Sequence, residues 1–575
     1  MNKLNLRLLK RFGALAKPYW FSKEKWKARW LLVLLVLLLI GETEFNVLFN
    51  EQSGEFTSAL AAQDAPRFWH SIRVFFGLLM FAIPIYAYYY YVRDKLAINW
   101  RRWLTDQYLD RYFKDRGFYH LLAKPDIDNP DQRIAEDISS FTQQSLSFLL
   151  IIVGGVFQLV AFSSVLWSIS KALVLFLVLY AVVGTVILFL VFGERLVSLN
   201  FFQRRLEADF RFSLVRIREN AEAIALYHGE RQEQGHIQKL FGKLFTNYNK
   251  LISWTLRLSF FQSANTLLTM VLPSVIIAPR VLSGELEVGS IVKAAGAFSA
   301  ILGVLSLLVD NLDELSRFAA GVGRLDAFAN SLAPAKTRKR LVGGKPVGGK
   351  IVTREGEQLS FEDVTLNTPN NERTLVKALT VSVPPGKGLM IVGASGLGKS
   401  SLLRAMAGLW DAGEGTLERP KADDMLFLPQ HAYMVIGSLR VQLNYPNLDR
   451  AVSDEELREV LDLVNLPGMV ERCGGFDAGF NFDNVLSVGE RQRLALARVL
   501  LKHPRYVLLD EATSALDREN ESALYKKLIA TSTTLVSVSH HPALVKYHDQ
   551  VLELKADGAW SLHSAKKFRF TEDLA

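Results

Sequence analysis

The sequence predicts an all-α transmembrane domain of six helices followed by an α/β domain. Three observations carry this prediction. The long apolar runs of the 575-residue chain fall almost entirely within its first 310 residues. A basic segment rich in glycine and proline follows them. The remaining residues alternate between strand-like and helix-like segments, which is the pattern of an α/β domain.

The composition narrows the class of protein. Half of the residues are apolar and 22% are charged. These whole-chain averages do not show that the apolar residues are concentrated in the first part of the chain. This composition excludes disordered, collagen-like and disulfide-rich secreted chains. Cys473 is the single cysteine and cannot form an intramolecular disulfide, which suits a reducing compartment. The net charge of +9 alone would suggest nucleic acid, but its placement beside apolar segments indicates a membrane surface. We therefore expect a lipid bilayer as a partner and no nucleic acid.

Six segments are candidates for membrane-spanning helices, each of which requires about 20 apolar residues. The third and fourth are the most apolar, and only residues 168–171 separate them, a turn short enough for nothing but a helical hairpin. The fifth contains Gln262, Asn265, Pro273 and Pro279 and is the weakest by composition. The expected spans lie near residues 29–50, 71–92, 147–168, 171–193, 255–280 and 288–310.

The distribution of lysine and arginine predicts the orientation of these spans. Residues 1–29 carry nine basic side chains and one acidic one, Glu24. The segments 93–146 and 194–254 are long and rich in basic residues, whereas the other connections carry little positive charge. We expect a multi-pass protein with both termini and the α/β domain in the cytoplasm. A cleaved signal peptide is the alternative, and it is disfavoured because the basic region is long and no convincing cleavage site follows.

Several polar residues lie within the expected spans, and each has two readings. Glu42 and Asn46 are one helical turn apart and share a face, which either lines a cavity or lies in the outer headgroup region. The tyrosines at 86 and 88–91 form an interfacial aromatic belt or stack against a transported solute. Lys293 and Asp310 either line the pathway or extend to the interface.

The domain boundaries follow from the change in composition. We expect the transmembrane domain to span residues 1–330, a linker 331–350, and the α/β domain 351–575. The linker assignment rests on the basic, glycine- and proline-containing run 333–350.

A phosphate-binding motif opens the second domain. Residues 393–400 read G-A-S-G-L-G-K-S and match G-x-x-x-x-G-K-[ST]. They follow an apolar strand, 388–392, and precede a helical segment, so that backbone N–H groups and a helix N-terminus can surround phosphates. Lys399 would bind the β- and γ-phosphates of ATP, and Ser400 would bind Mg²⁺. The nucleotide-binding residues expected from this segment are Gly393, Ser395, Gly396, Gly398, Lys399, Ser400 and Ser401.

A second motif follows about 110 residues later. Residues 506–509 form an apolar strand that ends in Asp510 and Glu511, at the edge where open α/β sheets bind ligands. Asp510 suits the metal, directly or through water. Glu511 suits the general base that positions the attacking water.

Between and after these elements stand four further motifs, in the same order as in ATP-binding cassette (ABC) ATPases. Residues 486–490, L-S-V-G-E, resemble the ABC signature L-S-G-G-Q, and residues 514–517 resemble the D-loop. Gln430 resembles the Q-loop glutamine, with a role in catalysis and metal binding, and His540 resembles the switch histidine. The resemblance implies an α/β P-loop ATPase, an ABC nucleotide-binding domain that works as a homodimer. Ser487, Gly489 and Glu490 of one copy would then contact the nucleotide held by the other copy.

The resemblance extends to the membrane part, and one membrane domain followed by one ATPase domain is the layout of an exporter-type (type IV) half-transporter. Residues 129–132, N-P-D-Q, and 221–230 resemble motifs of subfamily D, the acyl-CoA and cobalamin transporters. Residues 400–404, 407–410 and 427–430 resemble both this subfamily and the bacterial SbmA/BacA-type transporters of peptides and cobalamin.

Two departures from the family pattern matter. Val488 and Glu490 replace the Gly and Gln of the common signature. We expect activity to survive, because valine adds bulk without removing a donor and glutamate is frequent at this position in the subgroup that the chain resembles. Many members also place an aromatic residue near position 366 to stack on adenine, whereas this chain has Leu366. Apolar contact from Leu366 and Pro369 is a possible substitute.

The leading functional hypothesis is an ATP-driven transporter that imports cobalamin or another hydrophilic, peptide-like solute across a bacterial inner membrane. No presequence or C-terminal S-K-L address is expected, which favours this membrane over an organelle. The alternatives are a transporter or exporter of fatty acyl-CoA or lipid, and an ATP-gated channel or regulatory membrane ATPase. A soluble DNA-associated ATPase does not fit six hydrophobic spans.

Overall fold

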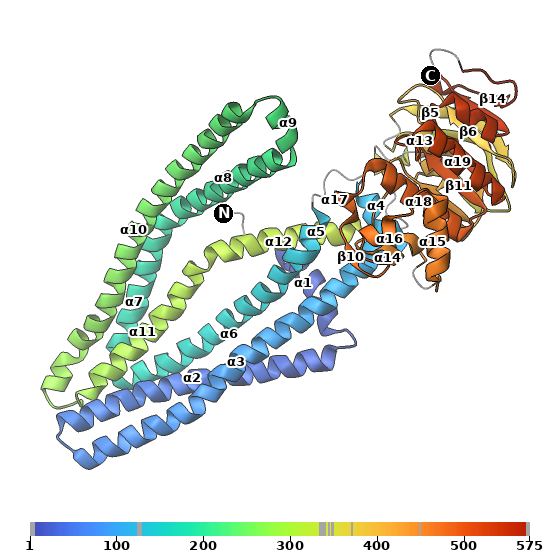
Figure 1. The fold of residues 1–575 in the computed structure, drawn as a ribbon. Helices are drawn as coiled ribbons and strands as arrows, with labels where there is room; N and C mark the ends of the chain where they lie inside the picture. Colours follow the sequence, from blue (N-terminus) through green and yellow to red (C-terminus); the bar gives the residue numbers. More distant parts are fainter. Residues whose placement is uncertain are drawn as a thin grey trace. The chain divides into compact units, whose positions relative to one another are not determined.

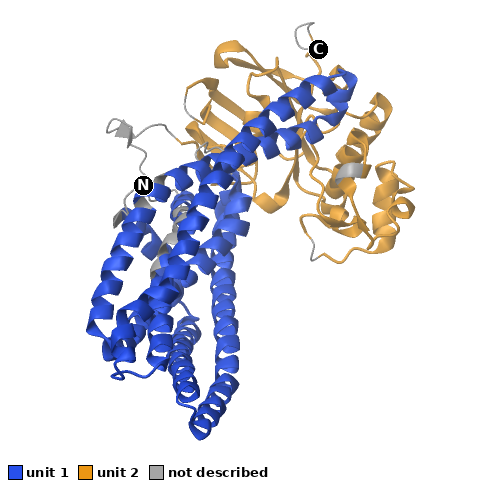
Figure 2. Ribbon diagram, turned by 90° about the vertical axis from the view of Figure 1, so that its left-hand side faces the viewer, with its two compact units in different colours: residues 1–337 blue, residues 338–575 orange. Residues whose placement is uncertain are grey.

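The computed structural model describes residues 6–122, 129–332, 341–342, 345–346, 350–369, 372–447 and 450–570. The chain forms two compact units, residues 1–337 and 338–575, and Figure 2 draws them in different colours. Most of the expected linker, 331–350, lies outside the described residues.

The first unit is helical throughout its described part (Figure 1). Five described helices are long and apolar enough to cross a membrane, and α11 contributes a shorter apolar stretch, Gly289–Val304. The elements are α1 (Leu6–Trp20), α2 (Lys25–Ala61), α3 (Ala65–Phe113), η1 (Lys114–Arg116), α4 (Gly117–Leu122), α5 (Pro130–Gln132), η2 (Arg133–Asp137), α6 (Ile138–Ile169), α7 (Lys171–Leu188), η3 (Phe189–Gly193), α8 (Glu194–Glu219), α9 (Ala221–Leu226), α10 (Glu230–Leu282), α11 (Gly289–Asp310) and α12 (Leu312–Ser331).

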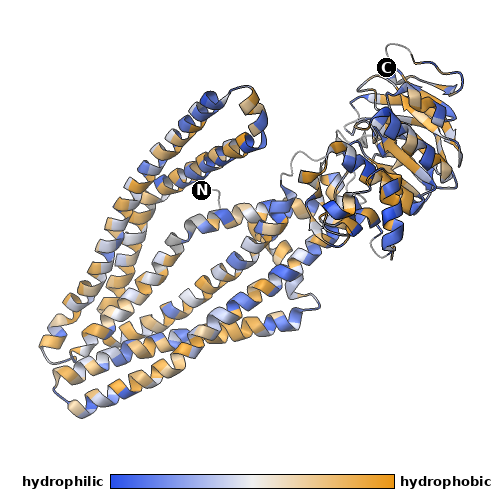
Figure 3. Cartoon of the chain, viewed as in Figure 1, coloured by the Kyte–Doolittle hydropathy of each residue, from blue (hydrophilic) through white to orange (hydrophobic). Residues whose placement is uncertain are grey.

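The spanning helices continue well beyond their apolar segments. The long basic segments 93–146 and 194–254 are therefore largely helical. α8 and α10 pack along each other as a hairpin that α9 closes (Figure 1). Figure 3 shows hydrophilic residues gathered where α8 and α10 approach α9. The apolar and polar portions of one continuous helix thus separate the membrane-crossing part from the water-exposed part.

Small residues bring α2, α6 and α11 into close contact. A Cβ on Gly54 of α2 would lie 2.8 Å from the carbonyl oxygen of Gly289 in α11. The Ser58 hydroxyl accepts a hydrogen bond of 3.0 Å from the Gly289 N–H. A Cβ on Gly155 of α6 would lie 3.0 Å from a Val304 methyl group of α11. Close backbone approach at small residues is typical of helix association in membranes.

The second unit is an α/β domain with two main sheets. The larger sheet has six strands in the order β14-β13-β6-β12-β11-β8, and the other has four in the order β3-β7-β4-β5. The strands are β1 (Leu341–Val342), β2 (Lys345–Pro346), β3 (Val352–Glu355), β4 (Leu359–Asn367), β5 (Thr374–Val383), β6 (Leu389–Val392), β7 (Gly413–Arg419), β8 (Met425–Leu428), β9 (Gly437–Ser438), β10 (Gly479–Phe480), β11 (Tyr506–Asp510), β12 (Thr534–Val538), β13 (Gln550–Leu554) and β14 (Trp560–Ser564).

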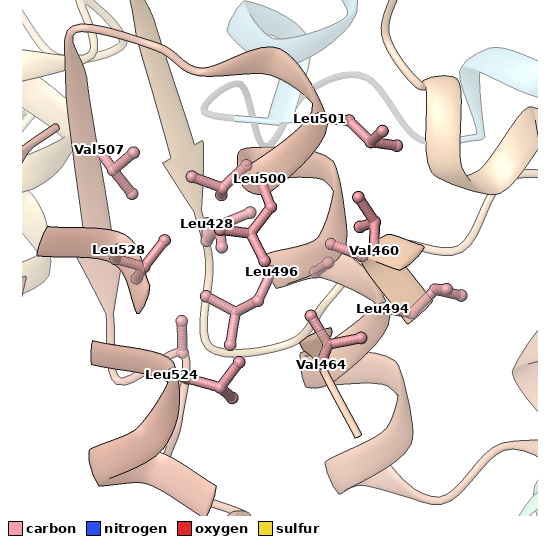
Figure 4. Close-up of a cluster of buried hydrophobic side chains, with 14 of the residues drawn as sticks. Leu428, Val460, Val464, Leu494, Leu496, Leu500, Leu501, Val507, Leu524 and Leu528 are labelled. Atoms are coloured by element: carbon pink, nitrogen blue, oxygen red, sulfur yellow. The ribbon is translucent and has the colours of Figure 1, made fainter. Parts of the chain in front are cut away.

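The helices of this unit cover the six-stranded sheet and build its core. β6, β11 and β12 are buried along their whole length, as expected for central parallel strands. Leucines of the long helix α18 pack with strand and helix residues in the cluster of Figure 4. The helices are α13 (Lys399–Met406), α14 (Leu439–Asn444), η5 (Ala422–Asp424), α15 (Asp454–Leu463), α16 (Met469–Arg472), α17 (Phe482–Val485), α18 (Val488–Lys502), α19 (Arg518–Ala530), η6 (Pro542–Tyr547) and η7 (Ala556–Gly558).

Candidate active site

Four neighbouring parallel strands end at one edge of the six-stranded sheet. β6 pairs with β12, β12 with β11, and β11 with β8, all in parallel. The phosphate loop begins directly after β6, and His540 lies two residues beyond β12. β11 ends in Asp510 with Glu511 next to it, and Gln430 lies two residues beyond β8. The topology therefore gathers motifs that are far apart in the sequence at one ligand-binding edge, and Ser400 and Asp510 alone are separated by 110 residues.

The phosphate loop has a backbone that only glycine adopts easily. Gly393, Gly396 and Gly398 have φ angles of 147°, 81° and 97°. A Cβ on Gly393 would also lie 2.7 Å from the Leu554 carbonyl oxygen. α13 begins directly after this loop, so its free N–H groups face the loop interior. Ser395 and Gly396 are exposed and Ser401 is half-buried in the first turn of the helix.

Lys399 is held inside the loop. Its ammonium donates hydrogen bonds to the carbonyl oxygens of Gly393 at 2.7 Å and Ala394 at 3.1 Å. Burial lowers the pKa of Lys399, and the carboxylates of Glu511 and Asp510 oppose this shift. The lysine thus lies among phosphate-binding N–H groups and within the field of both carboxylates.

Ser400 and Asp510 form the group of oxygens that suits a metal ion. The Ser400 hydroxyl donates to the Asp510 carboxylate at 3.0 Å. Burial raises the pKa of Asp510, and Glu511 adds to this rise, while Ser400, Arg404 and Lys399 oppose it. Within the described ranges, no three His, Cys, Asp or Glu side chains are grouped to hold a metal by themselves. A hydroxyl and a carboxylate fit Mg²⁺ bound together with nucleotide phosphates.

Glu511 is the centre of the expected catalytic group. The Gln430 side-chain amide donates to Glu511 Oε2 at 2.8 Å. His540 Nε2 lies 3.4 Å from Glu511 Oε1. The Glu511 backbone has a φ angle of 48°, a left-handed conformation that is unusual for glutamate. The structure thus brings together the three residues expected to be catalytic.

The signature residues form a separate group at the start of α18. Ser487 caps the helix: its hydroxyl accepts from the Glu490 N–H, and the Glu490 carboxylate accepts from the Ser487 N–H at 2.9 Å. Arg472 donates to the same carboxylate at 2.7 Å, and this contact lowers the pKa of Glu490 to about 2. A Cβ on Gly489 would lie 3.1 Å from the Ala515 carbonyl oxygen.

Gln492 is a site residue that the sequence motifs do not indicate. Its side chain is 2% exposed. It donates to the Gln430 carbonyl at 3.3 Å and to the Ser514 hydroxyl at 3.4 Å, and it accepts from the Ala515 N–H at 3.1 Å. It therefore joins the Q-loop to the D-loop. Its one sequence signal is a polar residue next to the apolar run of α18.

The suggested adenine contact through Leu366 is wrong. Leu366 is fully buried in the core between the two sheets, because it faces inward on β4. Pro369, which lies beyond the end of β4, is exposed.

The polar residues of the membrane domain form two groups. Tyr86 of α3 donates to the Asn46 side-chain oxygen at 2.8 Å, and one carboxylate oxygen of Glu42 is buried without a hydrogen-bond partner within the described residues. Lys293 lies 3.9 Å from the Glu55 carboxylate. Tyr88, Tyr90 and Tyr91 are exposed, and the side chain of Asp310 lies outside the described residues.

Comparison with known proteins gives matches along both units. Residues 15–282 match the family described as ABC transporter transmembrane region 2, and residues 376–514 match the ABC transporter family. An uncharacterized ABC transporter ATP-binding protein of Synechocystis is 45% identical over 94% of this chain and 83% of its own length. The chloroplastic ABC transporter D family member 2 of Arabidopsis thaliana is 38% identical over 95% of this chain and 86% of its own. The human lysosomal cobalamin transporter is 29% identical over 98% of this chain and 97% of its own.

Proposed function

This chain belongs to the ABC transporter family, and we propose that it works as a homodimer that imports cobalamin, or a similar hydrophilic or peptide-like solute, into a bacterial cytoplasm. The membership itself means a multi-pass membrane protein that binds ATP and couples its hydrolysis to transport. The direction, the cargo, the bacterial inner membrane and the homodimer are the parts that we propose.

The arrangement around Glu511 carries the proposal for ATP hydrolysis. Glu511 lies where a base can take a proton from a water molecule, with Gln430 and His540 in contact with its two oxygens. The Lys399 ammonium would exchange a loop carbonyl for a phosphate oxygen when ATP binds. His540 would contact the γ-phosphate of the ATP held by the same copy of the chain.

Mg²⁺ fits the oxygens of Ser400 and Asp510, and Gln430 would complete the set. When bound, Mg²⁺ would neutralise phosphate charge as the terminal phosphate leaves. The chain's own part is to hold the two oxygens together, as the hydrogen bond of 3.0 Å between them indicates. The elevated pKa of Asp510 would fall when a cation binds beside it.

The location of the signature group supports a dimer, and we propose that both of its members are copies of this chain. Within the described part of the chain, the side chains of Ser487 and Glu490 bond each other and Arg472 rather than the phosphate loop. A second copy would bring its Ser487 and Gly489 to the γ-phosphate. ATP would then favour the closed dimer, because the γ-phosphate contacts Ser487 and Gly489 of the second copy only in that state.

The cargo proposal rests on relatives. The human and mouse proteins named as lysosomal cobalamin transporters align with 98% of this chain, membrane domain included.

The orientation proposal rests on the basic residues. Their concentration at one end of the spans favours both termini in the cytoplasm of a bacterium.

Labelled cobalamin uptake tests the proposal in bacteria that lack their own cobalamin importer. Cells that express the chain should accumulate the label above the external concentration. Cells that express Glu511→Gln at an equal level should not, because loss of a general base reduces hydrolysis by about 10²–10⁴-fold. Equal, gradient-limited entry with both variants would contradict a pump and indicate a channel. Absence of entry with both would reject cobalamin in favour of a peptide or an acyl lipid.

A further inference from the structure

A buried glutamate is in contact with the neighbours of two residues of the proposed catalytic group. Glu521 is in the first turn of α19, and it is 2% exposed. Its place in the first turn suits a carboxylate, because the helix dipole is positive there. A carboxylate this deep still requires hydrogen bonds to both of its oxygens.

The two oxygens of Glu521 bind two different loops. Oε1 accepts from the Thr513 hydroxyl at 2.6 Å, and Thr513 lies two residues after Glu511. Oε2 lies 2.9 Å from Nδ1 of His541, the neighbour of His540. Thr513 is also buried, with 3% exposure, whereas the His541 side chain is 44% exposed. One carboxylate therefore joins the loop that carries the proposed base to the loop that carries the proposed switch histidine.

The relative position of these two loops matters for hydrolysis, because they carry Glu511 and His540. Glu511 has its strained φ of 48°, and backbone strain of this kind persists only where the surrounding structure holds it. The Glu511 N–H donates to the Val538 carbonyl at 3.1 Å, a second contact between the two chain segments that Glu521 links. The buried carboxylate of Glu521 is weak evidence for a stabilising role, since replacing a buried charged group with well-packed uncharged residues often leaves a protein as stable.

We propose that Glu521 is a positioning residue for ATP hydrolysis, which fixes the loops of Glu511 and His540 relative to each other through Thr513 and His541. This inference rests on the proposed catalytic role of Glu511. It assigns to Glu521 no contact with the nucleotide. A shift of Glu511 by about 1 Å can cost as much as 100-fold in rate, so removal of this link should reduce kcat rather than ATP binding.

The test compares variants of the full-length chain in lipid nanodiscs by phosphate release and ATP affinity. Glu521→Met, which removes both oxygens, and Thr513→Val should each reduce kcat by about 10- to 100-fold, with the KM for ATP changed by less than about 2-fold. Thr513→Ser keeps the hydroxyl and should retain most of the activity. Glu519→Met, on the exposed face of the same helix, is the matched control and should behave as the wild type. The double variant Glu521→Met, Thr513→Val should be no slower than the slower single variant, because both remove the same link.

Two results would overturn the inference. One is a wild-type kcat in Thr513→Val. The other is a loss of kcat that is accompanied by equal losses of ATP affinity and unfolding temperature, with Thr513→Ser as impaired as Thr513→Val. That result would indicate a structural role only. Glu511→Gln, measured alongside, separates this inference from its premise: wild-type hydrolysis there would reject the proposed role of Glu511 itself.

Discussion

At the scale of single residues, the structure gives a physical reason for the glutamate in the signature L-S-V-G-E. The Glu490 carboxylate has two sets of partners, the N–H and hydroxyl of Ser487 and the guanidinium of Arg472 in α16. A neutral glutamine could cap the helix but could not form the ion pair. The substitution therefore strengthens the link between α16 and the start of α18, and the Val488 side chain, 47% exposed, leaves this link untouched.

This ion pair makes a prediction about pH. The pKa of Glu490 falls from its ordinary 4.5 to about 2 in the folded chain, so folding favours the ionised form. Its stabilising contribution is complete above pH 4.5 and is lost as the pH falls toward 2. Glu490→Gln should lower the apparent unfolding temperature by about 2–4 °C at neutral pH, as expected for a loss of about 1 kcal/mol. The difference in unfolding temperature between Glu490→Gln and the wild type should become smaller below pH 4.5. A constant difference down to pH 3 would contradict this assignment.

Residues whose role depends on local sequence were predictable, and residues whose role depends on distant partners were not. Lys399 and Ser400 belong to one strand–loop–helix motif, so the sequence predicts where they lie and which groups surround them. Gln492 bonds a carbonyl 62 positions away, and Glu521 bonds a histidine 20 positions away, contacts that no local pattern encodes. Leu366 was suggested as an adenine contact because of the family pattern, which gives a position but not its exposure. Its burial depends on strands from other parts of the sequence.

At the scale of elements, glycines determine how closely the membrane helices approach. Hydropathy predicts where apolar helices lie, but it carries no information on which faces meet. Gly54, Gly155 and Gly289 mark those faces because a side chain at each would overlap a neighbouring helix. Helix packing of this kind requires the structure, since lipid and helix interior are equally apolar.

Gly289→Ala tests this contact between α2 and α11. The added Cβ would overlap the backbone of Gly54 and the hydroxyl of Ser58. Overpacking of this kind should destabilise the membrane domain by about 1–3 kcal/mol. Gly303→Ala, in the same helix, is the matched control, because no heavy atom lies within 4 Å of its Cβ position. Thermal denaturation in detergent should show a lower midpoint for the first variant only, and equal midpoints would refute the tight crossing.

The group around Glu42 makes a second prediction at this scale. Glu42 and Asn46 share one face of α2, Tyr86 of α3 bonds Asn46, and an oxygen of Glu42 is buried without a partner in the described part of the protein. Glu42→Gln should alter transport and leave ATP binding unchanged if this face borders the pathway. Glu44→Gln, which is exposed on the same helix, provides the control. Unchanged transport in Glu42→Gln would place the residue in the headgroup region.

At the scale of the whole molecule, the order of the two units and the class of each were predictable from the sequence. Apolar runs and basic segments identify the membrane unit, and six ATPase motifs in order identify the second. The division of the second unit into a six-stranded and a four-stranded sheet was not predictable, because strand order depends on contacts between distant segments. Family membership then joins the two units in one activity, transport driven by ATP.

The central claim is that ATP hydrolysis moves the solute against its gradient and toward the side of the ATPase domain. Liposomes that contain the chain should be prepared with labelled cobalamin at the same concentration inside and outside. Mg²⁺ and ATP added outside energise only molecules whose ATPase domain faces out. The account predicts that the internal concentration then falls below the external one, and that Glu511→Gln abolishes the change. Concentrations that stay equal would contradict active transport of cobalamin, and a rise inside would contradict import.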